Sequence, residues 1–136
     1  MSSNKKKYED GIILKVDKPI GWTSFDIVNK IRNTLKLKKV GHAGTLDPLA
    51  SGLLIVCTGK YTKKIHEYQD FDKEYIGSFV IGKTTPSHDL ETEFISSKSI
   101  KNITKEKIMK TTKSFIGNQY QIPPKFSAIK INGERA

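Results

Sequence analysis

The chain has 136 residues, of which 36% are hydrophobic and 28% are charged, and 24 Lys and Arg against 14 Asp and Glu give a formal net charge of +10. This length fits one domain, and the composition favours a soluble globular domain over a disordered chain. The positive excess favours a polyanionic partner, although a lysine-rich proteome would produce the same excess. A single cysteine, Cys57, excludes an internal disulfide and favours a reduced, cytoplasmic protein. We expect neither a signal peptide nor a membrane span, because no apolar segment is long enough.

The first half of the chain predicts short strands around one helix. The expected elements are, in order, a flexible basic tail at 1–10, a strand at 12–16, a helix beginning at 23–26, a Gly-rich loop at 41–52, a strand at 53–57 and a short helix at about 62–68. The helix start is the strongest local signal, because Thr23 and Asp26 match a capping box. Ile27, Ile31 and Leu35 then share one face of the helix.

The second half predicts a longer polar excursion and a final hairpin. The expected elements are a strand at 73–81 with alternating apolar residues, an exposed Ser- and Thr-rich stretch at 83–103, a helix at 105–116 ended by Gly117, an extended stretch at Pro123-Pro124, a strand at 128–131 and a turn at Asn132-Gly133. Because the sequence stops just after that turn, we expect the hairpin to lack its second strand.

Chemistry that depends on a metal or cofactor has no support in the sequence. His42, His66 and His88 are isolated, without His or Cys at ligand spacing. The sequence contains no phosphate-binding loop of the Walker type, no dinucleotide fingerprint and no nucleophile elbow. We therefore expect no metal and no cofactor, so that any reaction has to use ordinary side chains.

The Gly-rich segment GHAGTLDPLASG at 41–52 is the most specific feature of the sequence. Its glycines allow backbone conformations that other residues resist. Pro48 disfavours a helical conformation at Asp47, so the carboxylate of Asp47 is expected in a fixed, non-helical geometry. A lone Asp-Pro pair usually indicates only a turn. The complete segment, and not this pair alone, indicates a functional site.

That string resembles the signature of the tRNA pseudouridine synthase B family, and four other segments resemble the same family in the same order. They are KPIGWTS at 18–24, GKYTK at 59–63, KEY at 73–75 and QIPPKFSAIKING at 121–133. The resemblance covers nearly all of this chain but only the front part of a typical member. It implies an α+β fold, with a mixed, largely antiparallel sheet flanked by helices and an RNA cleft across it.

The activity implied by the resemblance is isomerisation of uridine to pseudouridine in tRNA, typically at position 55 of the T-loop. Asp47 would be the nucleophile, and a carboxylate suits glycosidic chemistry. Whether it attacks the sugar or the base is left open. Tyr75 would be the second catalytic residue, stacking on the target uracil and assisting proton removal, unless it is an ordinary core residue of a strand. The residues implied to bind RNA or shape the loop are His42, Lys18, Lys73, Gly44, Thr45 and Leu46, with Lys18 and Lys73 expected either to meet RNA or to brace the loop.

The chain also departs from the family. Many bacterial relatives carry Thr-Asp-Thr-x-Asp after the glycine at 82, whereas this chain has one acidic position replaced at 85–89. The family's remaining catalytic segment, with an arginine that pairs with the aspartate, and its C-terminal RNA-binding domain are not in the sequence. We therefore expect the 136-residue chain alone to have little or no activity, and the family suggests a monomer.

Two other classes of function would also explain the net positive charge of this chain. One is a non-catalytic module that binds or folds tRNA on the same scaffold, and the other is a small basic protein of a ribonucleoprotein particle. The second does not predict the Asp47 loop or Tyr75, so it ranks last. The first differs from the enzyme only in whether Asp47 performs chemistry.

Overall fold

The computed structural model describes residues 2–122, 130–131 and 134–135, and the chain divides into two compact units, Met1–Tyr75 and Ile76–Ala136. The elements of the first unit are α1 (Ser2–Asp10), β1 (Ile13–Lys18), α2 (Ser24–Leu35), β2 (Val40–Ala43), β3 (Gly52–Thr58), the 3-10 helix η1 (Gly59–Lys64) and α3 (Ile65–Gln69). Those of the second unit are β4 (Lys83–Thr84), β5 (Ser96–Ser97), α4 (Lys105–Lys113), β6 (Lys130–Ile131) and β7 (Glu134–Arg135).

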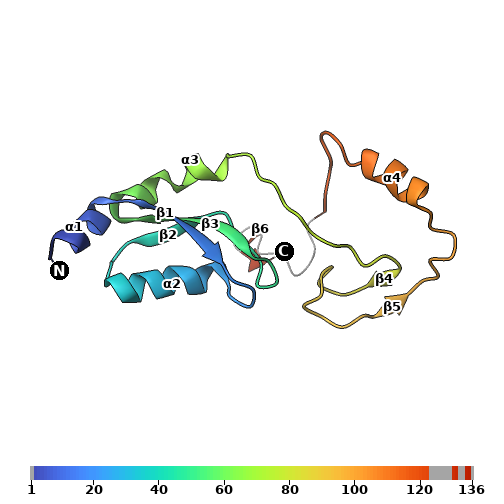
Figure 1. Cartoon of the computed structure of the whole chain (residues 1–136), viewed down its shortest axis with the longest axis horizontal. Helices are drawn as coiled ribbons and strands as arrows, with labels where there is room; N and C mark the ends of the chain where they lie inside the picture. Colours follow the sequence, from blue (N-terminus) through green and yellow to red (C-terminus); the bar gives the residue numbers. More distant parts are fainter. Residues whose placement is uncertain (1, 123–129, 132–133, 136) are drawn as a thin grey trace. The chain divides into compact units, whose positions relative to one another are not determined.

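The first unit is built on a three-stranded antiparallel sheet in the order β1-β3-β2 (Figure 1). Lys18 pairs with Gly52 at one end of the sheet, and Ile13 pairs with Cys57 at the other. The loop between β2 and β3 therefore leaves the sheet beside the C-terminal end of β1. The predicted α+β class with a largely antiparallel sheet and flanking helices is confirmed.

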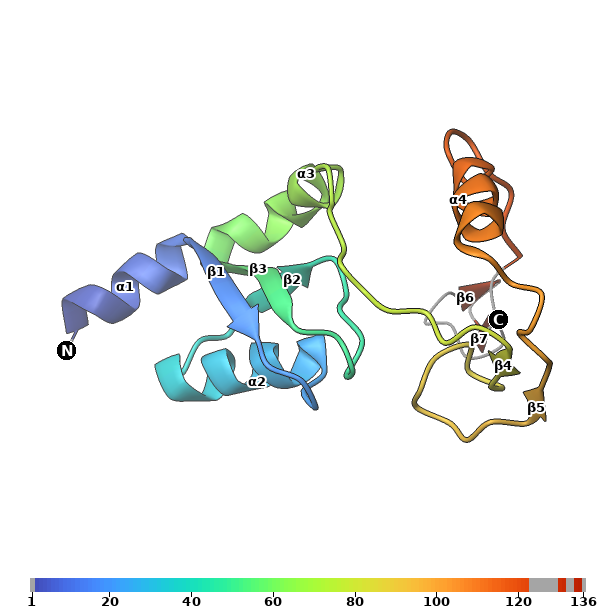
Figure 2. The ribbon, with the colours of Figure 1, turned by 45° about the vertical axis from the view of Figure 1, so that its right-hand side comes forward.

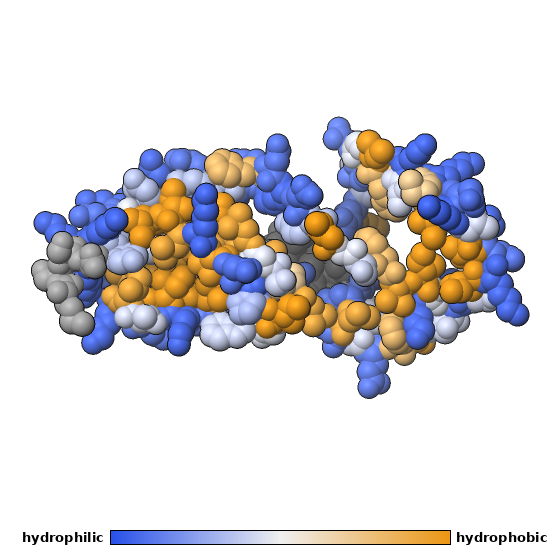
Figure 3. Space-filling model, viewed as in Figure 1, coloured by the Kyte–Doolittle hydropathy of each residue, from blue (hydrophilic) through white to orange (hydrophobic). Residues whose placement is uncertain are grey.

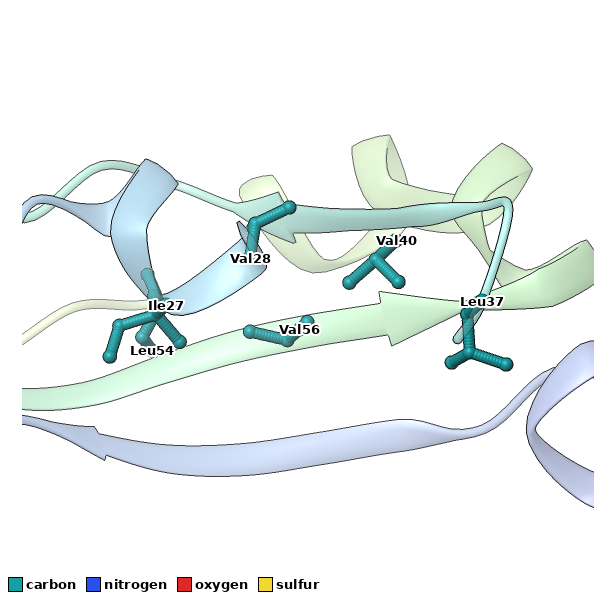
Figure 4. Close-up of a cluster of buried hydrophobic side chains, with 6 residues drawn as sticks. All are labelled: Ile27, Val28, Leu37, Val40, Leu54 and Val56. Carbon is teal, nitrogen blue, oxygen red and sulfur yellow. The ribbon is translucent and has the colours of Figure 1, made fainter. Parts of the chain in front are cut away.

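The core of this unit lies between α2 and the sheet (Figure 4). Its buried side chains are Ile27, Val28, Leu37, Val40, Leu54 and Val56. The predicted capping box that starts α2 is confirmed: the Thr23 hydroxyl accepts from the Asp26 amide, and the Asp26 carboxylate accepts from the Thr23 amide at 2.8 Å. The helix ends at Leu35, and the next residue, Lys36, caps it in the left-handed conformation with a φ of 50°.

The first residues form the helix α1 where we expected a flexible tail at 1–10. The end of α1 is held by the sheet, because the Thr58 hydroxyl donates to the Tyr8 carbonyl at 2.7 Å and accepts from the Ile12 amide at 3.2 Å. Gly59 has a φ of 53°, and a Cβ there would lie 2.0 Å from the Glu9 carbonyl oxygen. The polar and basic composition of the segment predicted a tail. The end of the helix is held by long-range contacts, which the local sequence does not reveal.

Three further predictions for helices and strands in the first 75 residues are confirmed with shifted bounds. The strand expected at 12–16 is β1, that at 53–57 is β3, and the helix expected at about 62–68 is η1 followed by α3. The strand expected at 73–81 is wrong: residues 72–80 are not assigned to any strand. A strand requires a hydrogen-bonded neighbour, and the described residues offer none to this segment, which leaves Ile76 and Phe79 95% and 96% exposed.

In the second unit, the helix expected at 105–116 is α4, which ends earlier and has Thr104 as its N-cap. The polar stretch at 83–103 contains a small hairpin, β4–β5. Its loop is held by Ser87, whose hydroxyl bonds the Asp89 carboxylate at 2.6 Å and the Thr92 hydroxyl at 2.7 Å. The final hairpin does have a second strand, since Lys130 pairs with Arg135 and Ile131 with Glu134, which corrects our expectation. The stretch at Pro123-Pro124, the start of the strand expected at 128–131 and the turn itself lie outside the described residues.

Candidate active site

Asp47 lies on the loop that joins β2 to β3 at the end of the sheet where β1 finishes (Figure 1). Its side chain is exposed, while its neighbours Leu46 and Pro48 are half-buried. Its own carbonyl accepts a hydrogen bond from the Ala50 amide at 3.0 Å, which closes a short turn around Pro48. The loop thus turns an acidic side chain to solvent on a backbone that is itself fixed.

Ser24 fixes this loop on the side of α2. The Ser24 hydroxyl accepts from the Leu46 amide at 2.9 Å and donates to the Leu46 carbonyl at 3.1 Å. Only 2% of Ser24 is exposed, and the Leu46 side chain packs against the core. The residue just before Asp47 is therefore bound at both of its backbone polar groups by one buried side chain. Sequence reasoning placed Ser24 in a family segment but missed this contact, because the partners are 22 residues apart.

A second attachment comes from the turn after β1. The Gly21 amide donates to the Pro48 carbonyl at 2.8 Å, and Gly21 has a φ of 83°, a conformation that favours glycine. This turn is held in place by Lys18, whose Nζ donates to the Trp22 carbonyl at 2.6 Å and to the Pro19 carbonyl at 3.1 Å. Lys18 is fully buried. Of the two roles expected for Lys18, this geometry favours bracing over contact with RNA.

Gly44 begins the loop, and His42 lies just before it in β2. The His42 ring is half-buried, and its Nδ1 is hydrogen-bonded to the Gly44 carbonyl, so that Nδ1 carries the proton in this contact. Gly44 has a φ of 92°, which a residue with a Cβ rarely adopts. Thr45 is exposed next to them. The expected residues His42, Gly44 and Thr45 thus lie on the chain that leads into Asp47, and the His42 ring is held by its local hydrogen bond to Gly44.

Lys73 and Tyr75 lie in the segment that follows α3. Both are exposed, Tyr75 by 70%. Lys73 Nζ donates to the Gln69 carbonyl at 2.6 Å and to the Phe71 carbonyl at 2.9 Å, so it closes the end of α3. Across residues 2–122, no hydrogen bond joins Lys73 or Tyr75 to the Asp47 loop. The structure therefore connects the loop to Lys18 through the turn at Gly21, whereas the hydrogen bonds of Lys73 go to α3 and the residues after it.

The surroundings of the loop show what the site could hold. The described residues contain no group of three or more His, Cys, Asp and Glu side chains placed to bind a metal. Among the same residues, no helix is both long and apolar enough to cross a membrane.

A hollow of about 380 Å³ lies at the turn that contacts Pro48. It is lined by Gly21, Trp22, Asp26, Asn29 and Lys30. Figure 3 shows apolar surface gathered over the sheet of the first unit.

Among solved structures, the chain resembles a chain in the "Crystal Structure of a Cbf5-Nop10-Gar1 Complex" with a TM-score of 0.60. That likeness has 27% sequence identity and covers 93% of this chain and 33% of the other. The chain thus has the fold of part of a much larger protein.

The family model that matches residues 32–136 describes the N-terminal domain of a class of RNA-modifying proteins, the pseudouridylate synthases. The chain belongs to the TruB family of these proteins, as its motifs had suggested. It is 50% identical over 135 residues to tRNA pseudouridine synthase B of Bacteroides fragilis, 51% over 137 residues to that of Flavobacterium johnsoniae and 54% over 132 residues to that of Parabacteroides distasonis. These matches cover 95%, 96% and 93% of this chain and 58%, 60% and 56% of the relatives, so the chain spans a little over half of their length.

Proposed function

We propose that the protein containing this chain converts uridine to pseudouridine in tRNA, and that Asp47 is its nucleophile. The observation that carries the proposal is the Asp47 loop. Its carboxylate is exposed while the residues on both sides, Leu46 and Pro48, are bound to Ser24 and Gly21. Preorganisation of this kind holds a reacting group in place before the substrate arrives. The relatives named tRNA pseudouridine synthase B support the choice of reaction.

The reaction is an isomerisation, so it neither adds nor removes atoms. The bond between N1 of uracil and C1′ of ribose breaks, and a bond between C5 and C1′ forms. The proton of C5 leaves to a base, and N1 gains a proton. A carboxylate can hold the fragments together through a covalent adduct, as in retaining glycosidases. These steps need a nucleophile and a proton acceptor, and both can be ordinary side chains.

The other residues of the site have roles that follow from their positions. Tyr75 is exposed and offers an aromatic face on which an extruded base can stack. His42 has one ring nitrogen engaged with Gly44, which orients the ring and leaves Nε2 for RNA. Lys73 offers a positive charge beside Tyr75. The proposal has three further parts, which the family resemblance supports. The target is the T-loop uridine at position 55, the protein is a monomer, and it is located in the cytoplasm.

The experiment is to map the product. The protein is incubated with unmodified tRNA transcripts, and pseudouridine is located by carbodiimide labelling and primer extension. The proposal expects one new pseudouridine, at position 55, and none in a transcript with cytidine there. Tight tRNA binding without any pseudouridine would instead favour the non-catalytic RNA-binding module.

A further inference from the structure

The positive charge of the first unit is concentrated at the end of the sheet opposite to Asp47. We define the basic end as residues 5–10, 36–39 and 59–64, which together carry nine lysines and two acidic residues, a net charge of +7. The rest of residues 1–75 carries five Lys and Arg against seven Asp and Glu, a net charge of −2. The charge excess of this unit therefore belongs to one place, and a generally lysine-rich composition does not explain such a distribution.

The fold brings these three segments together. The C-terminal end of α1, η1 and the end of α2 gather at the same end of the unit in two views (Figures 1 and 2). The Gly59 amide donates to the Lys39 carbonyl at 2.9 Å, which joins η1 to the segment after α2. Lys60 Nζ lies 3.4 Å from the Asp10 carboxylate, which joins η1 to α1. The lysines are thus clustered by contacts between the three segments and not only by sequence.

A hollow of about 430 Å³ lies within the basic end. Lys38, Lys39, Lys60 and Lys63 line it, with Leu37 and Glu9 beside them. All four lysines are exposed. The two acidic residues of the basic end are already engaged, since Glu9 lies 3.6 Å from Lys5 and Asp10 pairs with Lys60. Most of the positive charge is therefore available to an external anion.

We propose that the basic end binds the phosphate backbone of the same RNA whose uridine reaches Asp47; this inference rests on the proposed function. The seven residues of β3, from Gly52 to Thr58, separate the two places by about 20 Å at 3.4 Å per residue. Each strand of a duplex carries several phosphates over that distance, so one RNA stem can reach both. Because the charges are lysines, they bind backbone phosphates without reading sequence.

The test compares two double variants of the 136-residue chain in binding to an unmodified tRNA transcript. The first, Lys38→Gln with Lys63→Gln, removes two charges from the hollow. The matched control, Lys15→Gln with Lys101→Gln, removes two exposed lysines outside the basic end. Binding is measured over a series of salt concentrations. The first variant is expected to reduce the slope of log K against log salt by about 1.5 to 2, and to weaken binding about tenfold or more near 0.1 M salt.

The control variant is expected to keep the wild-type slope. Equal slopes for the two variants and the wild type would overturn the inference. This is the outcome expected if the basic end binds an acidic protein and not RNA. An equal loss in both variants would overturn it too, because the effect would then be one of net charge. The rate of pseudouridine formation at saturating RNA is measured separately with the protein containing the chain. If that rate is zero while the slopes differ, the proposed reaction fails and the phosphate surface stands.

Discussion

Lys18 gives the sharpest test of how the active-site loop is held. The substitution Lys18→Met keeps an unbranched side chain of similar length and removes both hydrogen bonds of Nζ. The carbonyls of Pro19 and Trp22 then lose their donor, and each lost hydrogen bond to a charged group costs about 1.5–3 kcal/mol. Better burial of the thioether offsets part of this cost. The free energy of unfolding is therefore expected to fall by about 2–4 kcal/mol.

The measurement is urea unfolding followed by circular dichroism, with Lys15→Met as the matched control. Lys15 is an exposed lysine of the same strand, so its variant is expected to stay within about 0.5 kcal/mol of the wild type. Tight tRNA binding should survive in both variants. A Lys18→Met chain with wild-type stability and weakened tRNA binding would refute the bracing role and restore Lys18 as a residue that contacts RNA.

Three further predictions concern the loop, the first helix of the core and the single thiol. Ser24→Ala removes both hydrogen bonds to Leu46 and is expected to lower the free energy of unfolding by about 1–3 kcal/mol; a neutral effect in urea unfolding would contradict the attachment. Thr23→Ala removes the helix cap and is expected to cost about 1 kcal/mol. Hydrogen bonds from Thr23 lower the pKa of Asp26, so their stabilisation is present above the ordinary pKa of 3.8 and is lost as the pH falls through the lower value in the folded protein. Unfolding measured between pH 6 and pH 2 should show this loss in the wild type and less of it in Thr23→Ala. Burial raises the pKa of the Cys57 thiol, so alkylation at pH 8 should be at least about tenfold slower in the folded chain than in urea, and equal rates would refute its burial.

The sequence predicted those features that depend on neighbouring residues. The capping box at Thr23 and Asp26 starts α2 as expected, and the apolar run at 53–57 forms β3. The hydrogen bonds that fix the Asp47 loop could not be predicted in this way. Ser24 contacts Leu46 across 22 residues, and the burial of Lys18 is decided by the strands packed around it.

Two wrong expectations have the same origin in tertiary contacts. The basic composition of α1 predicted a tail, but Thr58 holds the end of this helix through the Tyr8 carbonyl. The alternation around Tyr75 predicted a strand, but alternation indicates only which faces would be apolar and cannot supply a hydrogen-bonded neighbour. The resemblance to a family identified the loop, and the structure supplied the contacts that hold it.

The central claim is that Asp47 is the nucleophile. Single-turnover formation of pseudouridine in a tRNA transcript, by the protein containing this chain, tests it most directly when Asp47→Asn is compared with Asp17→Asn, an exposed aspartate of β1. We predict that Asp47→Asn lowers the rate by at least about a thousandfold while tRNA affinity changes by less than about threefold, and that Asp17→Asn retains the wild-type rate. Pseudouridine formed by Asp47→Asn at the wild-type rate would contradict the account.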